Sequence, residues 1–390
     1  DRDTLARDLF ANSYKRVCDQ IDRGYKFVAD CSLNDTLSEI EFDQIVYYKK
    51  AAGNVLATSL DYARYVDTVV WNRDDFLPAD YHYEMHHGQT FYKTTDYYGY
   101  GWHMNAADPT VLWHTGGAVG GVTVVRVQLE TEMVTTVFCD IQTGTTGLYQ
   151  MIGAAETYFV TTTAVPVITT SMVSSETGYV GYPAFDRQME AFSAEFGNAG
   201  CSISVMKGGE VMYNYGTGEI DIDGDNKIFR VASLSKNVAA AAMGIALGED
   251  VNGYGLSVNS TIADVLAFDA AKLEIFQKFS TISAYLDIIT IKQLASMNSG
   301  FRHYEALHEY LWAPDADDTR SILEQYLSLF GDDDLFCEPG SCYKYSSFGY
   351  YILAELIEVI SGMDFYDFEE QKIYTALGLT EMGDRDTLAR

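Results

Sequence analysis

The stretch from Phe229 to Leu247 constrains this chain most, because a short strand-like run gives way there to a long alanine-rich helical run. Ser233 and Lys236 lie at this junction, one turn apart on the same face of the expected helix. A serine hydroxyl needs an adjacent base to act as a nucleophile, and a buried lysine with a lowered pKa can be that base. The helix N-terminus also offers N–H groups to an oxyanion. Because Ser-x-x-Lys also occurs by chance at exposed helix starts, the tetrad needs independent support.

Two further motifs supply that support. They are Tyr345-Ser346-Ser347 and His114-Thr115-Gly116-Gly117. Together with Ser233 and Lys236 they resemble the motifs of the serine β-lactamase and penicillin-binding-protein superfamily. The similarity is greatest to its class C-like branch of esterases, D-amino-acid peptidases and β-lactamase-related proteins, and it extends over roughly residues 183–390 and 1–158. The resemblance implies an α/β (α+β) fold, in which an antiparallel sheet of five or more strands carries helices on both faces and meets a mostly helical lobe at the active site.

The resemblance also implies a role for each motif residue. Ser233 would be the acylated nucleophile and Lys236 its base. Tyr345 would relay a proton to the leaving group and later activate water. His114 would hold Tyr345 in place and bind a substrate carboxylate or carbonyl. The backbone N–H groups of Ser233 and Gly117 would form the oxyanion hole. The expected reaction is acyl transfer to water from a small ester or amide, with no cofactor and no metal.

Substrate-binding roles fall to three neighbouring residues, and the family pattern is broken at one of them. Thr115 and Gly116 would line the substrate site beside His114. Ser347 stands where the family usually has an asparagine that helps to bind substrate, which puts β-lactamase and transpeptidase activity in doubt. Met297 stands where the family has a histidine, and we expect a structural role there. Because fold does not fix function, the substrate has to be argued from the site itself.

The motifs occur in an order that differs from that of the family. The His114 motif, last in the family, precedes Ser233, and the heptapeptide DRDTLAR stands at both 1–7 and 384–390. Joining residue 383 to residue 1 restores an uninterrupted family sequence, so the order is circularly permuted. The chain could be an engineered permutant, one period of a tandem polyprotein or head-to-tail filament, or a closed ring, and we favour the repeat.

This order divides the chain into three parts. Residues 1–158 would form the C-terminal half of the β-lactamase-like fold and residues 183–390 its N-terminal half, in the same domain or in the next repeat. Residues 159–182 would be a Thr/Ser-rich linker. A second function therefore stays open: a structural repeat unit of an extracellular filament or adhesive that self-associates head to tail and has little or no activity.

Composition excludes some partners. The 56 acidic residues outnumber the 26 basic ones, giving a formal net charge of −30, which argues against nucleic acid and anionic membranes as partners. No apolar run approaches the length of a membrane-spanning helix. The hydrophobic share of 47% is enough for one large, two-lobed domain.

Six cysteines and two glycosylation sequons indicate an oxidising, extracellular location. The sequons begin at Asn34 and Asn259. Sequence proximity suggests pairing Cys337 with Cys342 and Cys18 with Cys31, although six cysteines allow fifteen arrangements. The resemblance places the strands of Cys139 and Cys201 side by side, which implies the third pair.

Two other clusters give weaker signals. The loop 221–226 alternates carboxylates as a calcium loop does, but its glycine is displaced and its twelfth position is Ala232 rather than glutamate. His82, His86 and His87 lie close together without a fourth ligand at a suitable spacing. We therefore expect an exposed turn at the first cluster and no metal at either.

Overall fold

The computed structural model describes residues 50–93, 95–118, 121–140, 146–161, 182–195, 200–218, 228–305, 309, 312, 314–315 and 317–384. Several predictions concern residues outside these ranges. They are the N-terminal copy of the heptapeptide and residues 385–390 of the second copy, residues 162–181 of the linker, the loop 221–226, the Asn34 sequon and the Cys18–Cys31 pair.

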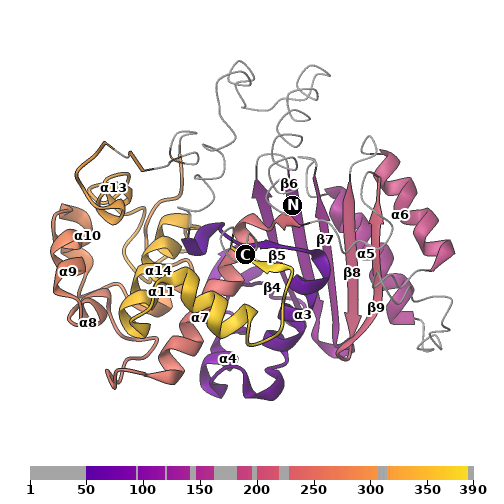
Figure 1. Ribbon diagram of the computed structural model, residues 1–390, viewed down its shortest axis with the longest axis horizontal. Coiled ribbons are helices and arrows are strands. Elements are labelled where there is room, and N and C mark those ends of the chain that lie inside the picture. The colour runs from indigo at the N-terminus through magenta and orange to yellow at the C-terminus, as the bar shows by residue number, and fades with distance from the viewer. Residues whose placement is uncertain are drawn as a thin grey trace, which may run out of the picture.

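An eight-stranded antiparallel sheet forms one side of the molecule (Figure 1). Its strands lie in chain order: β2 (Thr90–Lys93), β3 (Asp96–Tyr98), β4 (His103–Asn105), β5 (Val111–Ala118), β6 (Gly121–Gln128), β7 (Met133–Cys139), β8 (Cys201–Lys207) and β9 (Glu210–Thr217). Strand β7 pairs with β8 over its full length, from Met133 opposite Lys207 to Cys139 opposite Cys201. The parts of the chain before and after the 159–182 segment therefore share one sheet.

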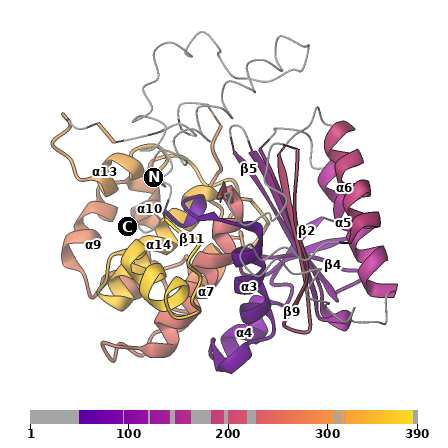
Figure 2. The same ribbon diagram turned by 45° about the vertical axis from the view of Figure 1, so that its right-hand side comes forward.

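The sheet carries helices on both faces, as expected. Helix α3 (Ser59–Val70) packs on β7 and β8, while α5 (Thr146–Thr161) packs on β6 and β7 from the other side. Helix α6 (Pro183–Glu195) covers β9 beside α5 (Figure 2). Side chains alternate between the faces of a strand, so Phe138 of β7 contacts Tyr62 of α3, while Val137 joins the apolar cluster that includes α5.

A mostly helical lobe forms the other side of the molecule, with α7 (Ser235–Glu249) between that lobe and the sheet (Figure 1). Helix α14 (Ser347–Ser361) packs on α7 and on α11. The small sheet β10–β1–β11 brings together three distant segments, Phe229–Arg230, Leu56–Ala57 and Met382–Gly383. The other α-helices of the described residues are α4 (Ala79–Met85), α8 (Ile262–Leu266), α9 (Ala270–Gln277), α10 (Ser280–Tyr285), α11 (Ile291–Ala295), α13 (Ile322–Leu327) and α15 (Phe365–Glu369).

Two of the three expected cysteine pairs lie in the described residues, and both are confirmed. Cys139 and Cys201 are directly opposite in the β7–β8 pairing and form a disulfide with their Cα atoms 4.1 Å apart. Cys337 and Cys342 close the short turn between them. No helix among the described residues has both the length and the apolar character needed to cross a membrane.

Candidate active site

The nucleophile turn is a short, conformationally unusual piece of backbone. Ser233 lies half-buried in η5 (Ala232–Leu234), a single 3₁₀ turn directly before α7. Ala232 has a φ of +49°, in the left-handed region that residues with a Cβ rarely adopt. Residues in such regions persist only where the surroundings fix them, and they cluster at functional sites. The turn therefore presents Ser233 in a conformation that the fold imposes.

Lys236 lies in the first turn of α7, fully buried beside Ser233. Its Nζ atom is 3.2 Å from Ser233 Oγ and donates to the Ala52 carbonyl oxygen at 3.1 Å. The rings of Tyr345 and Tyr350 lie 4.9 and 5.8 Å from Nζ. Burial lowers the pKa of Lys236 from 10.5 to about 7, because the ammonium loses its hydration there. A neutral amine at this distance can accept the Ser233 proton.

Tyr345 stands two residues before α14, and its ring lies beside Lys236 Nζ. Ser346 caps that helix, since its Oγ accepts from the Gly349 N–H at 3.0 Å and donates to the Arg302 carbonyl at 2.7 Å. Burial raises the pKa of Tyr345 above its usual range, and a hydrogen bond with Ser233 acts in the opposite direction. The phenol is therefore protonated at neutral pH, so it can donate a proton and Lys236 is the available base.

His114 of β5 is buried, and both of its ring nitrogens have hydrogen-bond partners. Nδ1 lies 2.8 Å from the Thr115 carbonyl oxygen and Nε2 lies 3.1 Å from the Tyr98 hydroxyl. A carbonyl only accepts, so Nδ1 carries the proton and Nε2 of the neutral ring accepts from Tyr98. Burial, with His103 and Lys236 nearby, holds the pKa of His114 well below its usual range. The ring centroids of His114 and Tyr345 are 6.4 Å apart, so the two side chains contact each other through their aromatic rings.

Gly116 allows β5 to lie against the nucleophile turn. A Cβ at this position would be 2.1 Å from the Val231 carbonyl oxygen and 2.3 Å from Thr123 Oγ1. Thr123 Oγ1 in turn donates to the same Val231 oxygen at 3.0 Å. The half-buried Thr115 and the exposed Gly117 flank Gly116 on the same strand. The two residues proposed for the oxyanion hole, Ser233 and Gly117, thus belong to adjoining elements.

Comparison with known proteins agrees with this geometry. The sequence model of the family described as Beta-lactamase matches residues 185–384, just over half of the chain. The chain belongs to the beta-lactamase family. The matched range holds Ser233, Lys236 and Tyr345, whereas His114 lies outside it, as the permuted motif order requires.

Curated relatives of this family member match over a short stretch. The serine beta-lactamase-like protein LACTB, mitochondrial, of Homo sapiens is 45% identical over 53 residues, which are 14% of this chain and 10% of the human protein. The proteins of the same name from Mus musculus and Bos taurus are also 45% identical over 53 residues, 9% of each. The match thus spans about a tenth of the length of these relatives.

The fold brings to Tyr345 a residue that the sequence did not single out. His303 lies perpendicular to the Tyr345 ring, with centroids 5.1 Å apart, and its Nδ1 accepts from the Ser347 N–H at 3.2 Å. Ser347 itself is buried at the start of α14. Met297 has a φ of +60°, and its carbonyl and sulfur accept from the backbone N–H groups of Lys344 and Ser346. No local motif marks His303, because its contacts with Tyr345 and Ser347 join segments more than forty residues apart.

Of the two clusters considered for metals, the three histidines lie in the described residues, on and directly after α4. His82 is on α4, His86 is its C-cap and His87 follows. Nδ1 of His86 lies 3.1 Å from the His82 carbonyl oxygen, and Nδ1 of His87 lies 2.6 Å from the Tyr83 carbonyl oxygen. Within the described ranges, no three histidine, cysteine, aspartate or glutamate side chains converge as metal ligands do.

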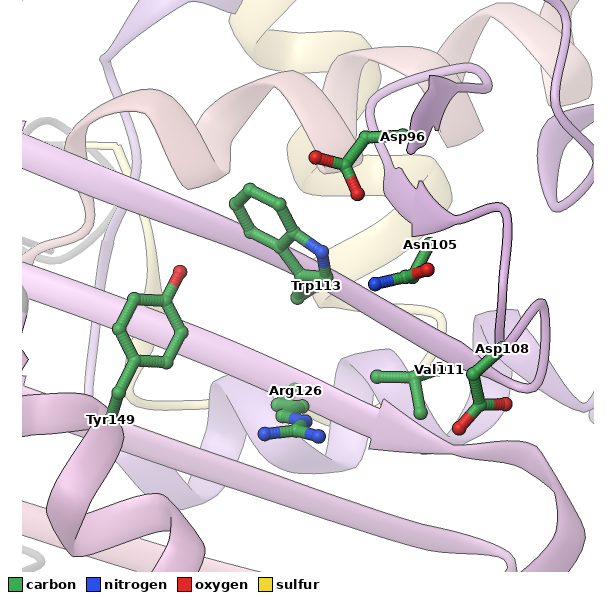
Figure 3. Close-up of a pocket in the computed structure, with 7 residues that line it drawn as sticks. All are labelled: Asp96, Asn105, Asp108, Val111, Trp113, Arg126 and Tyr149. Carbon is green, nitrogen blue, oxygen red and sulfur yellow. The ribbon is translucent and has the colours of Figure 1, made fainter. Parts of the chain in front are cut away.

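A cavity of about 300 Å³ opens beside Trp113, which alternates with His114 along β5 and so points to the other face of the strand (Figure 3). Its lining comes from β3 to β6, the β4–β5 loop and α5, and consists of Asp96, Asn105, Asp108, Val111, Trp113, Arg126 and Tyr149. None of the proposed catalytic residues lines it.

Proposed function

We propose that this chain is a serine hydrolase that cleaves a small ester or amide through an acyl-enzyme formed on Ser233. The observation that carries the proposal is the contact of 3.2 Å between Ser233 Oγ and a buried Lys236 whose pKa is lowered to about 7. A lysine in that state is half deprotonated at neutral pH, so it combines a free lone pair with direct access to the serine proton.

The residues around Ser233 account for both halves of the reaction. Neutral Lys236 takes the hydroxyl proton while Ser233 Oγ attacks the substrate carbonyl carbon. The N–H groups of Ser233 and Gly117 bind the resulting oxyanion. Collapse of this intermediate breaks the bond to the leaving group, which takes a proton from Tyr345, and Lys236 restores the proton on Tyr345. Water then attacks the acyl carbon, and the proton transfers run in reverse: Tyr345 takes a proton from the water and Lys236 returns one to Ser233 Oγ. The products are the acid and free Ser233.

The charge state of His114 favours an uncharged substrate. His114 is neutral because it is buried and its pKa lies well below its usual range, so it offers no positive charge to a substrate carboxylate. Ser347 replaces the family asparagine and provides only a short, buried hydroxyl. Both features favour an ester or neutral amide over a carboxylate-bearing β-lactam, and we propose that Thr115 and Gly116 line the acyl-binding side.

We propose that the enzyme works outside the cell as one domain. The two described disulfides and the exposed Asn259 sequon suit an oxidising, glycosylating compartment. The pairing of β7 with β8 and the disulfide Cys139–Cys201 support closure of residues 1–158 and 183–390 into one domain.

Labelling with a fluorophosphonate probe tests the proposal. We expect wild-type protein and Ser257→Ala, which changes an exposed serine, to be labelled, and Ser233→Ala to remain unlabelled with the same circular dichroism. Hydrolysis of p-nitrophenyl esters should follow the same pattern. Folded wild-type protein that takes up no label would overturn the hydrolase proposal and favour the structural-repeat alternative.

A further inference from the structure

The base Lys236 is oriented by a single backbone carbonyl. A neutral amine has two N–H donors and one lone pair, and the lone pair must face the Ser233 hydroxyl for proton transfer. The N–H bond to Ala52 O at 3.1 Å fixes the rotation of the amine, which leaves the lone pair free to point towards Ser233 Oγ at 3.2 Å. The position of the Ala52 carbonyl therefore decides whether Lys236 can act.

The segment that carries Ala52 has little stability of its own. Ala52 ends η2 (Lys50–Ala52), one 3₁₀ turn, and Lys50 has a φ of +37°. Inside the segment, the N–H groups of Gly53 and Asn54 donate to the Lys50 carbonyl at 3.2 Å. An isolated turn of this length is unstable, because few hydrogen bonds offset the fixed backbone. Contacts from elsewhere in the fold must hold it.

Lys50 provides such a contact through a compact charge cluster. Its Nζ atom bonds to the carboxylate of Glu355 and, at 2.7 Å, to that of Glu358, and Lys272 of α9 bonds to the same two carboxylates. Burial acts to raise the pKa of Glu355, but the two ammonium groups hold it below its usual range. Two positive and two negative charges leave the cluster neutral. Glu355 and Glu358 belong to α14, which begins two residues after Tyr345, so the cluster connects η2 to the helix that follows the proposed proton donor.

Asn54 provides a second contact on the other side of Ala52. Its Nδ2 donates to Glu369 Oε2 of α15 at 3.0 Å, and the Tyr374 hydroxyl donates to the same oxygen at 3.0 Å. Both Asn54 and Glu369 are buried. The backbone around Ala52 is therefore fixed on both sides, through the bonds of Lys50 to α14 and the bond of Asn54 to α15.

We propose that Lys50, through its bond to Glu355, is a positioning residue that keeps the Ala52 carbonyl where it orients Lys236 for proton abstraction. This inference rests on the proposed function. Lys50 touches none of the reacting groups, so its loss acts on the activation of Ser233 and not on substrate binding. The expected signature is a fall in kcat with KM unchanged, and an equal fall in the rate of fluorophosphonate labelling.

Two charge-balanced double variants separate positioning from simple stabilisation. Lys50→Met with Glu355→Gln removes one pair and leaves Lys272 with Glu358, but it cuts the tie to η2. Lys272→Met with Glu358→Gln removes the other pair and keeps Lys50 bonded to Glu355. We expect the first variant to lose at least tenfold in kcat and labelling rate, and the second to stay within twofold of wild type, at similar urea midpoints. The single variant Lys50→Arg should recover most of the rate.

The outcomes are distinct. Equal losses in both double variants, or no loss in the first, would overturn the positioning role, and so would a loss confined to KM. If Lys50→Met with Glu355→Gln fails to fold, Asn54→Leu replaces it. This variant removes the contact with Glu369 and should lower kcat while KM stays unchanged. Failure of wild-type protein to label at all would instead remove the proposed function, so the two failures cannot be confused.

Discussion

Replacing Lys236 with methionine should abolish activity and also make the protein more stable at low pH. Below pH 7 the wild-type folded state holds a charged ammonium in a fully buried position. The interval between the usual pKa of 10.5 and the folded value of about 7, at about 1.4 kcal/mol per pH unit, amounts to about 5 kcal/mol of destabilisation. Methionine has a similar length and no charge. It leaves the Ala52 carbonyl without its donor, at a cost of about 1–3 kcal/mol, so the net gain at pH 6 should be about 2–4 kcal/mol.

The pH dependence of this gain is the sharper test. Between pH 7 and 10.5 the unfolded chain binds a proton on Lys236 that the folded chain has released, so the contribution of Lys236 to wild-type stability rises with pH by about 1.4 kcal/mol per unit. The methionine variant lacks this contribution. Because Lys236 is half deprotonated at pH 7, the advantage of the variant should shrink by about 2 kcal/mol between pH 7 and pH 9, whatever the loss at Ala52.

Urea unfolding at pH 6, 7, 8 and 9, followed by intrinsic fluorescence, measures this difference, with Lys278→Met as a control at an exposed lysine. The rate of fluorophosphonate labelling of wild-type protein should rise with pH around a midpoint near 7, since the same deprotonation creates the base. A stability difference that stays constant over this range, or a labelling rate that does not change with pH, would refute the argument that burial prepares Lys236 as the base.

Two further predictions concern other buried positions. Gly116→Ala should lose most labelling and about 1–3 kcal/mol of stability, because its Cβ would lie 2.1 Å from the Val231 carbonyl; Gly153→Ala, whose Cβ meets nothing within 4 Å, is the control for both assays. Burial raises the pKa of Glu369 from 4.5 to about 8, so the contribution of this carboxyl group to stability should fall as pH rises across that window. Glu369→Gln should remove this pH-dependent loss of stability, which urea unfolding measures. An unchanged pH dependence would contradict the interpretation of Glu369 as a buried, protonated acid.

The sequence predicts those parts of the fold where local pattern and packing agree. The β8–β9 hairpin follows from alternating residues on either side of Gly208 and Gly209, which have φ values of +58° and +83° in the turn. Sequence periodicity also predicts helices over 183–195, 234–248 and 348–361, and α6, α7 and α14 occupy nearly these ranges. The Ser-x-x-Lys spacing placed Ser233 and Lys236 one turn apart, and their side chains do meet.

Other parts depend on contacts that no local pattern encodes. The strands β2 to β4 lie in a tyrosine-rich stretch, 90–105, without clear alternation, so no local pattern marks them, although the eight strands agree with the five or more that the resemblance implies. The tie between Lys50 and Glu355 joins residues 305 positions apart, and neither residue stands in a recognisable motif. The neutral state of His114 depends on burial and on the nearby His103 and Lys236, which the motif His-Thr-Gly does not reveal.

The distribution of charge in this half of the molecule follows from what a lysine base requires. A carboxylate within about 4–6 Å of Lys236 would favour its charged form and cancel the effect of burial. In the described part of the chain, Lys236 makes its polar contacts with Ser233 and Ala52 instead. The carboxylates of Glu355 and Glu358 form ion pairs with Lys50 and Lys272 and not with Lys236. Charge can then fix the backbone that orients the base without protonating it, because the link between the two is an uncharged carbonyl.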